Sequence, residues 1–138
     1  MPLSPEAPRF LAPMLVAVDF DRTRAFYRDI LGLPVHGERP FAECRTATSL
    51  LTIFDREFLA RSHEMEFPTA MVPGLTSHTV ISIEVDDLEE TFERVIRLGF
   101  PFLSAPSDRL PLGRKYAFLR DPDGRTVVLF GKRASPPA

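Results

Sequence analysis

The side chains that could take part in chemistry are few and scattered along the chain. Three histidines are present, His36, His63 and His78, and imidazole is a frequent metal ligand and general base. They fall on different predicted elements, so we expect each to be a surface or hydrogen-bonded side chain. The histidines alone therefore do not indicate a metal centre.

An activated nucleophile is not indicated either. Ser82 and Cys44 carry the hydroxyl and the thiol to consider, but no base and orienting group stand at a recognisable spacing from them. Glu43 and Arg45 share one face of a predicted strand, which is more typical of a solvated ion pair than of a catalytic pair. The sequence also lacks glycine-rich phosphate loops and paired-cysteine metal motifs.

The composition limits the partners of the chain. A formal net charge of −2 provides no concentrated basic surface, so we expect neither nucleic acid nor membranes among them. No apolar run reaches the roughly 20 residues that span a bilayer. Cys44 is the only cysteine, which excludes an intrachain disulfide and favours a cytoplasmic location. A length of 138 residues with 44% hydrophobic residues suits one domain.

The first half of the chain predicts one helix among several strands. Asp19 or Asp21 can cap the helix, Phe26 and Ile30 lie on one face of it, and Gly32 can end it. Short apolar runs separated by turn residues predict the strands, at 14–18, 35–36, 41–46 and 50–54.

The second half predicts the same succession. Asp87 to Glu90 form a capping box, and the helix carries an apolar stripe that stops at Gly99. The stripe consists of Leu88, Phe92 and Val95. The predicted strands lie at 80–85, 102–103, 115–119 and 126–130. Asp121 to Gly124 form a strong hairpin turn between the last two.

The two halves therefore look like a repeat. Val18-Asp19 and Val85-Asp86 precede helices that end, at the same spacing, in Leu31-Gly32 and Leu98-Gly99. Neither half could bury one face of its sheet alone, so we predict one α+β domain of two βαβββ modules. The predicted parts are a flexible tail at 1–11, module 1 at about 12–56, a connector at 57–77, module 2 at about 78–132 and a flexible tail at 133–138.

Five segments of the chain carry a family resemblance: 18–33, 41–45, 50–54, 84–88 and 113–124. In this order and spacing they resemble the vicinal oxygen chelate superfamily, the glyoxalase, bleomycin-resistance and dioxygenase group. The resemblance covers nearly the whole chain outside the tails. It implies that the two modules form a cupped, partly open, mixed sheet of eight strands. It implies this fold and no single reaction, because function depends on the site.

In metal-dependent relatives, one side chain from the first and the fourth strand of each module binds a divalent ion inside the cup. The spacing of the resemblance places these positions at Ala12, Thr52, Val80 and Val128. Alanine and valine have no lone pair to donate, and a neutral threonine hydroxyl is a poor ligand by itself. We therefore expect neither the family metal nor another cofactor.

Strand alternation predicts which side chains line the cup. The candidate ligand-binding residues are Thr52, Phe54, His78, Ser82, Glu84, Tyr116, Phe118 and Phe130. Such a wall, apolar and aromatic with a few polar groups, is typical of a small-molecule pocket. Several of these side chains could equally pack as barrel core. Glu84 is the charge expected near the mouth, which favours a cationic ligand.

Three functions remain open. The first is a metal-free protein that sequesters a small aromatic or amphipathic compound, with antibiotics as one class of ligand, similar to the bleomycin-resistance branch. The second is a metal-dependent lyase, isomerase or dioxygenase with displaced ligands. The third is an enzyme without cofactor that uses Glu84, His78 or Tyr116 for proton transfer. The missing ligands favour the first.

We also expect a homodimer, because relatives of this size usually complete their clefts across a two-fold axis, and because the connector contains Met65, Phe67 and Met71.

Overall fold

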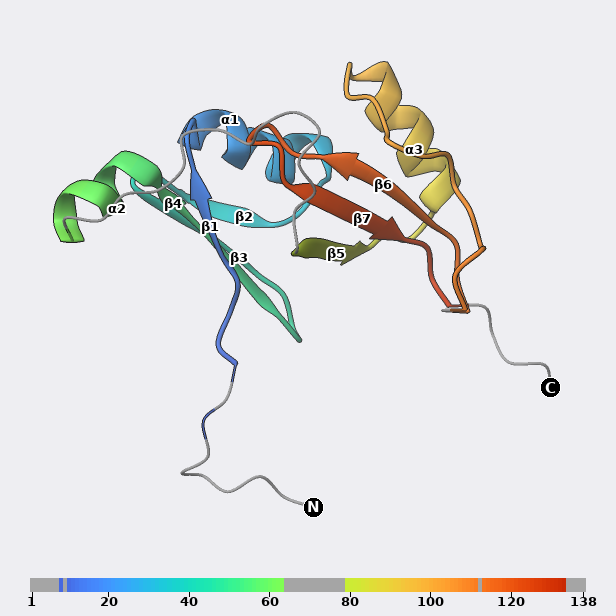
Figure 1. Cartoon of the computed structure of the whole chain (residues 1–138), viewed down its shortest axis with the longest axis horizontal. Helices are drawn as coiled ribbons and strands as arrows, with labels where there is room; N and C mark the ends of the chain where they lie inside the picture. Colours follow the sequence, from blue (N-terminus) through green and yellow to red (C-terminus); the bar gives the residue numbers. More distant parts are fainter. Residues whose placement is uncertain (1–7, 9, 64–78, 112, 134–138) are drawn as a thin grey trace.

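The computed structural model describes residues 8, 10–63, 79–111 and 113–133 (Figure 1). The elements follow one another as β1 (Met14–Ala17), α1 (Phe20–Ala25), the π-helix η1 (Phe26–Ile30), β2 (Val35–Glu38), β3 (Phe41–Arg45), β4 (Leu50–Asp55), α2 (Arg56–His63), β5 (Val80–Glu84), α3 (Leu88–Arg97), β6 (Tyr116–Arg120) and β7 (Thr126–Phe130). This order repeats a strand, a helix and further strands, as predicted.

The strands form two mixed sheets rather than a closed barrel. The first has the order β1-β4-β3-β2 and the second the order β5-β7-β6. In each sheet the first and last strands of a module pair in parallel, β1 with β4 and β5 with β7, while the other neighbours are antiparallel. The predicted α+β class with two βαβββ modules and a partly open sheet is confirmed.

The eighth predicted strand is reduced to isolated pairings among the described residues. Phe102 bridges to Leu119 and Ser107 to Tyr116, without a continuous ladder. Pro101 and Pro106 lie in this segment and have no backbone N–H to donate, which explains why a regular strand does not form beside β6.

The two module helices begin alike but differ in length by one residue. The side chains of Asp19 and Asp87 accept hydrogen bonds from the N–H groups of Arg22 and Glu90. Asp19 therefore corresponds to Asp87, and the predicted match of Asp19 with Asp86 is wrong by one position. The stretch from Asp19 to Gly32 is one residue longer than the stretch from Asp87 to Gly99, and the π-helical turn η1 accommodates the additional residue.

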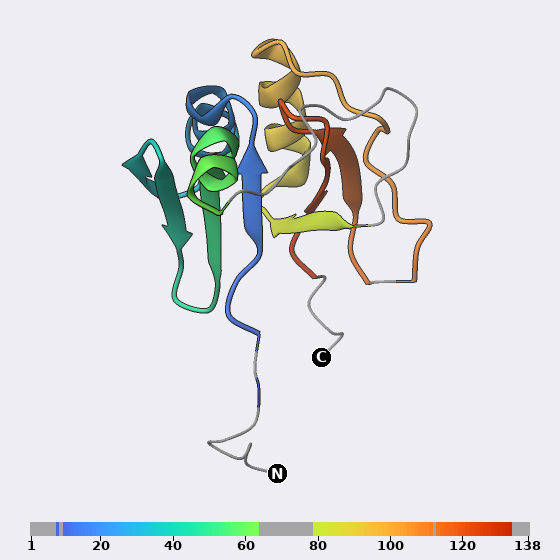
Figure 2. The ribbon, with the colours of Figure 1, turned by 60° about the vertical axis from the view of Figure 1, so that its left-hand side comes forward.

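Both modules contribute to one hydrophobic core beneath the helices. Ala17 and Ile53 come from the first sheet, Leu119 and Leu129 from the second, and Val95 from α3. Phe92 is partly buried, and its ring lies 4.6 Å from that of Phe102. The core explains why the helices lie on one side of the sheets in Figures 1 and 2.

The first part of the predicted connector is helical. Arg56–His63 form α2, which contains no buried residue and has Phe58 exposed to solvent. Met65, Phe67 and Met71 lie outside the described residues, as does most of both predicted tails. Phe10 and Leu11, which precede β1, are fully exposed. In the described part of the chain, no helix is long and apolar enough to cross a membrane.

Candidate functional site

Each sheet has an open face, which we define as the face turned away from the helices and the core. On the first sheet, Thr52 lies opposite Glu43 and Met14, and Phe54 lies opposite Phe41. The rings of Phe41 and Phe54 are 4.6 Å apart, and both remain partly accessible to solvent. The open face of the first sheet therefore combines an aromatic pair with a row of polar side chains.

The open face of the second sheet carries three aromatic rings. Tyr116 lies 5.7 Å from Phe118 and 6.0 Å from Phe130, measured between ring centroids. Ser82 lies opposite Val128 and therefore beside this cluster. Tyr116 is buried, whereas Phe118 and Phe130 are half-buried, so the last two rings are the ones that a ligand can reach.

A cation lies at the edge of this aromatic cluster. Arg114 Nη1 lies 2.8 Å from the Oε2 of Glu84, and the guanidinium carbon lies 5.8 Å from the centre of the Phe130 ring. The sequence did not predict this ion pair. Because Arg114 compensates the charge of Glu84, the open face has no uncompensated anion there, and the reason to favour a cationic ligand is weakened.

A cavity of about 640 Å³ lies at the seam between the two sheets. The whole of β5 together with Thr79 lines it, and further lining residues come from the β3–β4 hairpin. Cys44, Leu33 and Pro13 complete it. We call it the seam cavity. Of the predicted ligand-binding residues, Ser82 and Glu84 line it.

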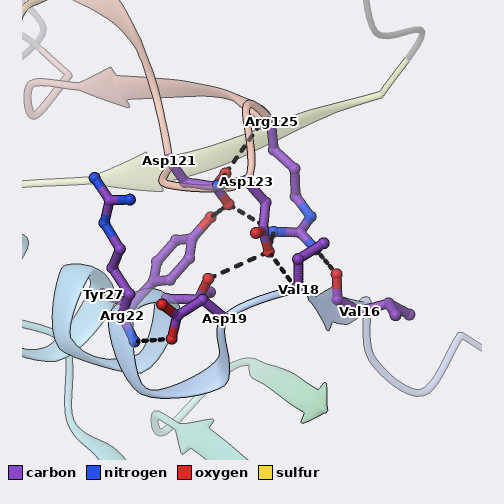
Figure 3. Close-up of polar contacts among 9 residues, drawn as sticks. Val16, Val18, Asp19, Arg22, Tyr27, Asp121, Asp123 and Arg125 are labelled. Carbon is purple, nitrogen blue, oxygen red and sulfur yellow. Dashed lines mark hydrogen bonds and ion pairs between the residues drawn. The ribbon is translucent and has the colours of Figure 1, made fainter. Parts of the chain in front are cut away.

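A buried polar cluster joins the two modules on the helix side (Figure 3). The Oη of Tyr27 donates a 2.7 Å hydrogen bond to Oδ2 of Asp121, which also lies 2.9 Å from Nη1 of Arg125. Oδ2 of Asp123 accepts from the hydroxyl of Thr23 and from the N–H of Val18, both at 3.2 Å. The turn between β6 and β7 is thereby attached to the first module.

The electrostatics of this cluster keep its charges paired. Burial raises the pKa of Tyr27, and the carboxylate of Asp121 raises it further. Burial alone would lower the pKa of Arg125, but Asp121 and Asp123 outweigh it and the pKa is raised. Arg125 also donates through Nη2 to the carbonyl oxygen of Val16. Tyr27 stays protonated and Arg125 stays charged, so the cluster is a structural link with no group poised for proton transfer.

Sequence reasoning identified the turn of this cluster but not its role. Asp121 to Gly124 was predicted as a hairpin, and Asp121 accepts from the N–H groups of Asp123 and Arg125 as such a turn requires. The partner Tyr27 lies far away in the sequence. The one available signal was an arginine directly after a turn with two aspartates.

Comparison with known proteins agrees with this architecture. The model of the Glyoxalase/Bleomycin resistance protein/Dioxygenase superfamily matches residues 9–129. The chain belongs to this superfamily. It is 24% identical over 125 residues to the uncharacterized protein YraH of Bacillus subtilis (strain 168), covering 88% of this chain and 97% of YraH.

Solved structures of similar fold come from several bacteria. A protein of unknown function from Agrobacterium tumefaciens str. C58 superposes with a TM-score of 0.74 at 19% identity, over 92% of this chain and 96% of its own. A lactoylglutathione lyase from Agrobacterium tumefaciens superposes with a TM-score of 0.64 at 26% identity, over 93% and 95%. These similarities support the superfamily fold and leave the reaction open.

The residues that the sequence resemblance places at the superfamily's metal positions do not fit a metal ion. Val80 pairs with Thr126, two residues before Val128, and Met14 pairs with Thr52. Ala12 lies two residues before Met14, so the register offset between Ala12 and Thr52 across the β1–β4 pair equals the offset between Val80 and Val128 across the β5–β7 pair. This equality supports the choice of Thr52. Only Thr52 has a side-chain oxygen, and its hydroxyl lies 3.3 Å from the carbonyl oxygen of Pro13. Across the described residues, no group of three or more His, Cys, Asp or Glu side chains could hold a metal.

The structure divides the predicted ligand-binding residues between the two open faces. Thr52 and Phe54 lie on the first sheet. The second sheet carries Ser82, Glu84, Tyr116, Phe118 and Phe130. His78 lies outside the described residues. Within one chain the described candidates thus lie in two groups, one on each open face, which we call half-sites.

Proposed function

We propose that this superfamily member binds a small planar or amphipathic molecule on its open faces, without a metal at the positions of Ala12, Thr52, Val80 and Val128. The observation that carries the proposal is the combination of that donor-poor set with accessible aromatic rings on the same faces. The biological role would be sequestration, similar to the bleomycin-resistance branch, with an antibiotic as one class of ligand.

Stacking supplies the main attraction in this proposal. Phe118 and Phe130 offer half-buried rings, and each aromatic contact contributes about 0.5–1.5 kcal/mol beyond the area that it buries. The ion pair of Arg114 and Glu84 lies next to Phe130 and can orient either an acidic or a basic group of the ligand. Ser82 adds a hydroxyl on the same face.

A second copy of the chain would complete each half-site. The open face of the first sheet carries Glu38, Glu43 and Arg45, which sum to one negative charge. The open face of the second sheet carries Glu84, Arg114 and Arg120, which sum to one positive charge. Opposite charges on the two faces favour a two-fold dimer in which each first sheet covers the second sheet of the partner.

A thermal-shift screen of antibiotics and aromatic metabolites tests the binding proposal. Hits on the wild type should raise the melting temperature, because they bind only the folded state. The Phe118→Ala variant should lose most of this rise, and Phe58→Ala should keep it, since Phe58 is an exposed phenylalanine on α2 away from the open faces.

Two results would overturn the proposal. Equal shifts for wild type and Phe118→Ala would place the ligand elsewhere. Conversion of a hit into a product, followed by mass spectrometry, would replace sequestration with catalysis.

Two observations favour the metal-dependent alternative. His36 lies opposite Glu43, and Glu43 lies opposite Thr52, so an imidazole and a carboxylate share the open face beside a superfamily metal position. The similarity to a lactoylglutathione lyase points the same way. Two side chains fall short of the three protein ligands of a catalytic zinc site, so a partner subunit would have to supply another. Elemental analysis of the purified protein distinguishes the two functions.

A further inference from the structure

We infer that the seam cavity is a second binding site, for a slender apolar molecule with an uncharged hydrogen-bonding head, and that binding there does not depend on the aromatic rings of the open faces. The cavity measures about 640 Å³, within the range of roughly 300–1,000 Å³ that ligand pockets occupy. The two sites share Ser82 and Glu84 of β5, but the aromatic rings proposed to stack on the first ligand do not line the cavity, so the body of each ligand meets a different surface.

The walls of the seam cavity consist of core side chains that the fold leaves partly uncovered. Leu33, Leu51, Ile81 and Ile83 pack against the hydrophobic core, yet each stays partly accessible. They come from both modules and converge on one space. Apolar surface of this kind gains stability when an apolar group displaces water from it. The ligand body should therefore be aliphatic or aromatic.

The polar groups of the cavity determine the head of the ligand. β5 is an edge strand among the described strands, and six consecutive residues, 79–84, line the cavity, so the strand presents its backbone edge to it. The hydroxyl-bearing residues Thr48, from the β3–β4 hairpin, and Ser82, from β5, both line the cavity. None of the described lining residues is lysine or arginine, and the carboxylate of Glu84 is paired with Arg114. A hydroxyl, amide or neutral amine fits this set, whereas a carboxylate or phosphate does not.

The thiol of Cys44 reports on the occupancy of this cavity. Cys44 is the only cysteine of the chain, lines the cavity and is 5% exposed. Burial raises the pKa of the Cys44 thiol, so it contributes an apolar surface to the wall and reacts slowly with alkylating reagents. A molecule in the cavity should cover the thiol further.

The experiment uses N-phenyl-1-naphthylamine, a neutral amine that fluoresces in apolar surroundings, as the probe. The β3–β4 turn provides a matched pair of variants on the full-length protein. Thr48→Trp places a bulky side chain on a residue that lines the cavity, while Ala47→Trp places the same side chain on the neighbouring exposed residue, which does not line it. Titration of the probe is combined with the rate of Cys44 alkylation by iodoacetamide, and Phe118→Ala tests the open face.

The expected result is probe binding that Thr48→Trp weakens about tenfold or more, while Ala47→Trp and Phe118→Ala leave it unchanged. The probe should also slow alkylation of Cys44 in the wild type. Equal binding by the two tryptophan variants, or unchanged alkylation at saturating probe, overturns the inference. Loss of binding in Phe118→Ala alone also overturns it, but leaves the open-face proposal standing, so the two failures are distinguishable.

Discussion

The hydroxyl of Tyr27, in the π-helix of the first module, donates a 2.7 Å hydrogen bond to the buried carboxylate of Asp121, in the turn of the second. Asp121 also holds Arg125, whose guanidinium reaches back to β1 at Val16. The link is therefore a buried polar contact between the modules, alongside the 3.2 Å hydrogen bond that Nη2 of Arg94 donates to the carbonyl oxygen of Ile30. Its removal should affect the stability of the whole domain.

Replacement of Tyr27 by phenylalanine should lower the free energy of unfolding by about 1.5–3 kcal/mol, because a buried hydrogen bond to a charged group is lost. Urea denaturation followed by circular dichroism measures the change. Tyr116→Phe is the matched control: its hydroxyl accepts a 3.2 Å bond from the N–H of Leu110, and its loss should cost less than about 1 kcal/mol. If the two substitutions lowered the free energy of unfolding equally, the hydrogen bond to Asp121 would add no more stability than an ordinary hydrogen bond of a tyrosine hydroxyl.

The same hydrogen bond predicts a loss of stability at alkaline pH. Burial and the carboxylate of Asp121 raise the pKa of Tyr27 in the folded chain, whereas the pKa of the phenol in the unfolded chain is about 10. The contribution of Tyr27 is thus complete below the unfolded pKa and is lost as the pH rises above it, by about 1.4 kcal/mol per pH unit. Urea titrations between about pH 9 and 11 should show the advantage of wild type over Tyr27→Phe shrinking with pH. A constant difference would contradict this assignment.

The regular elements were predictable because their signals are local. The strand Thr126–Phe130 was placed at its observed bounds from an apolar run next to a strong turn. Alternation with a period of two then placed Thr52, Phe54 and Phe118 on the open faces, opposite the core. The π-helix escaped prediction because a single inserted residue leaves the apolar stripe almost unchanged.

The features that join distant segments were not predictable. Tyr27 and Asp121 are separated by most of the chain, and neither residue type alone indicates a buried pair. Arg114 lies in an irregular segment before β6, so no periodicity directs it toward Glu84. The seam cavity depends on how the edge of β5 faces the β3–β4 hairpin, which is a property of the packed modules.

Removal of metal ions should leave the protein unchanged. Dialysis against a chelator should not shift the melting temperature, because Ala12, Val80 and Val128 provide no ligand and nothing that binds only the folded state is withdrawn. Differential scanning calorimetry before and after dialysis measures this. Stoichiometric zinc, nickel, manganese or iron that survives dialysis would contradict the prediction, and His36→Ala with Glu43→Gln would then identify the ligands.

The charges of the open faces predict how assembly responds to mutation. Glu38 lies on the first sheet and Arg120 on the second, each on the open face and outside the described ion pairs. If the first sheet of one chain covers the second sheet of the other, Glu38→Arg should weaken the dimer through repulsion, and Arg120→Glu should do the same. Combined in one chain, the two substitutions exchange the signs and should restore part of the affinity.

Light scattering of the four proteins at tens of micromolar and at two salt concentrations measures these effects. The wild type should have the mass of a dimer, each single variant should dissociate at lower concentration than wild type, and the double variant should lie between. The differences should shrink at high salt, because exposed charges are screened beyond the Debye length of about 8 Å at physiological ionic strength. A wild type that remains a monomer would refute the dimer itself. Additive weakening in the double variant would instead show that the two faces do not meet, since opposite faces in contact must couple.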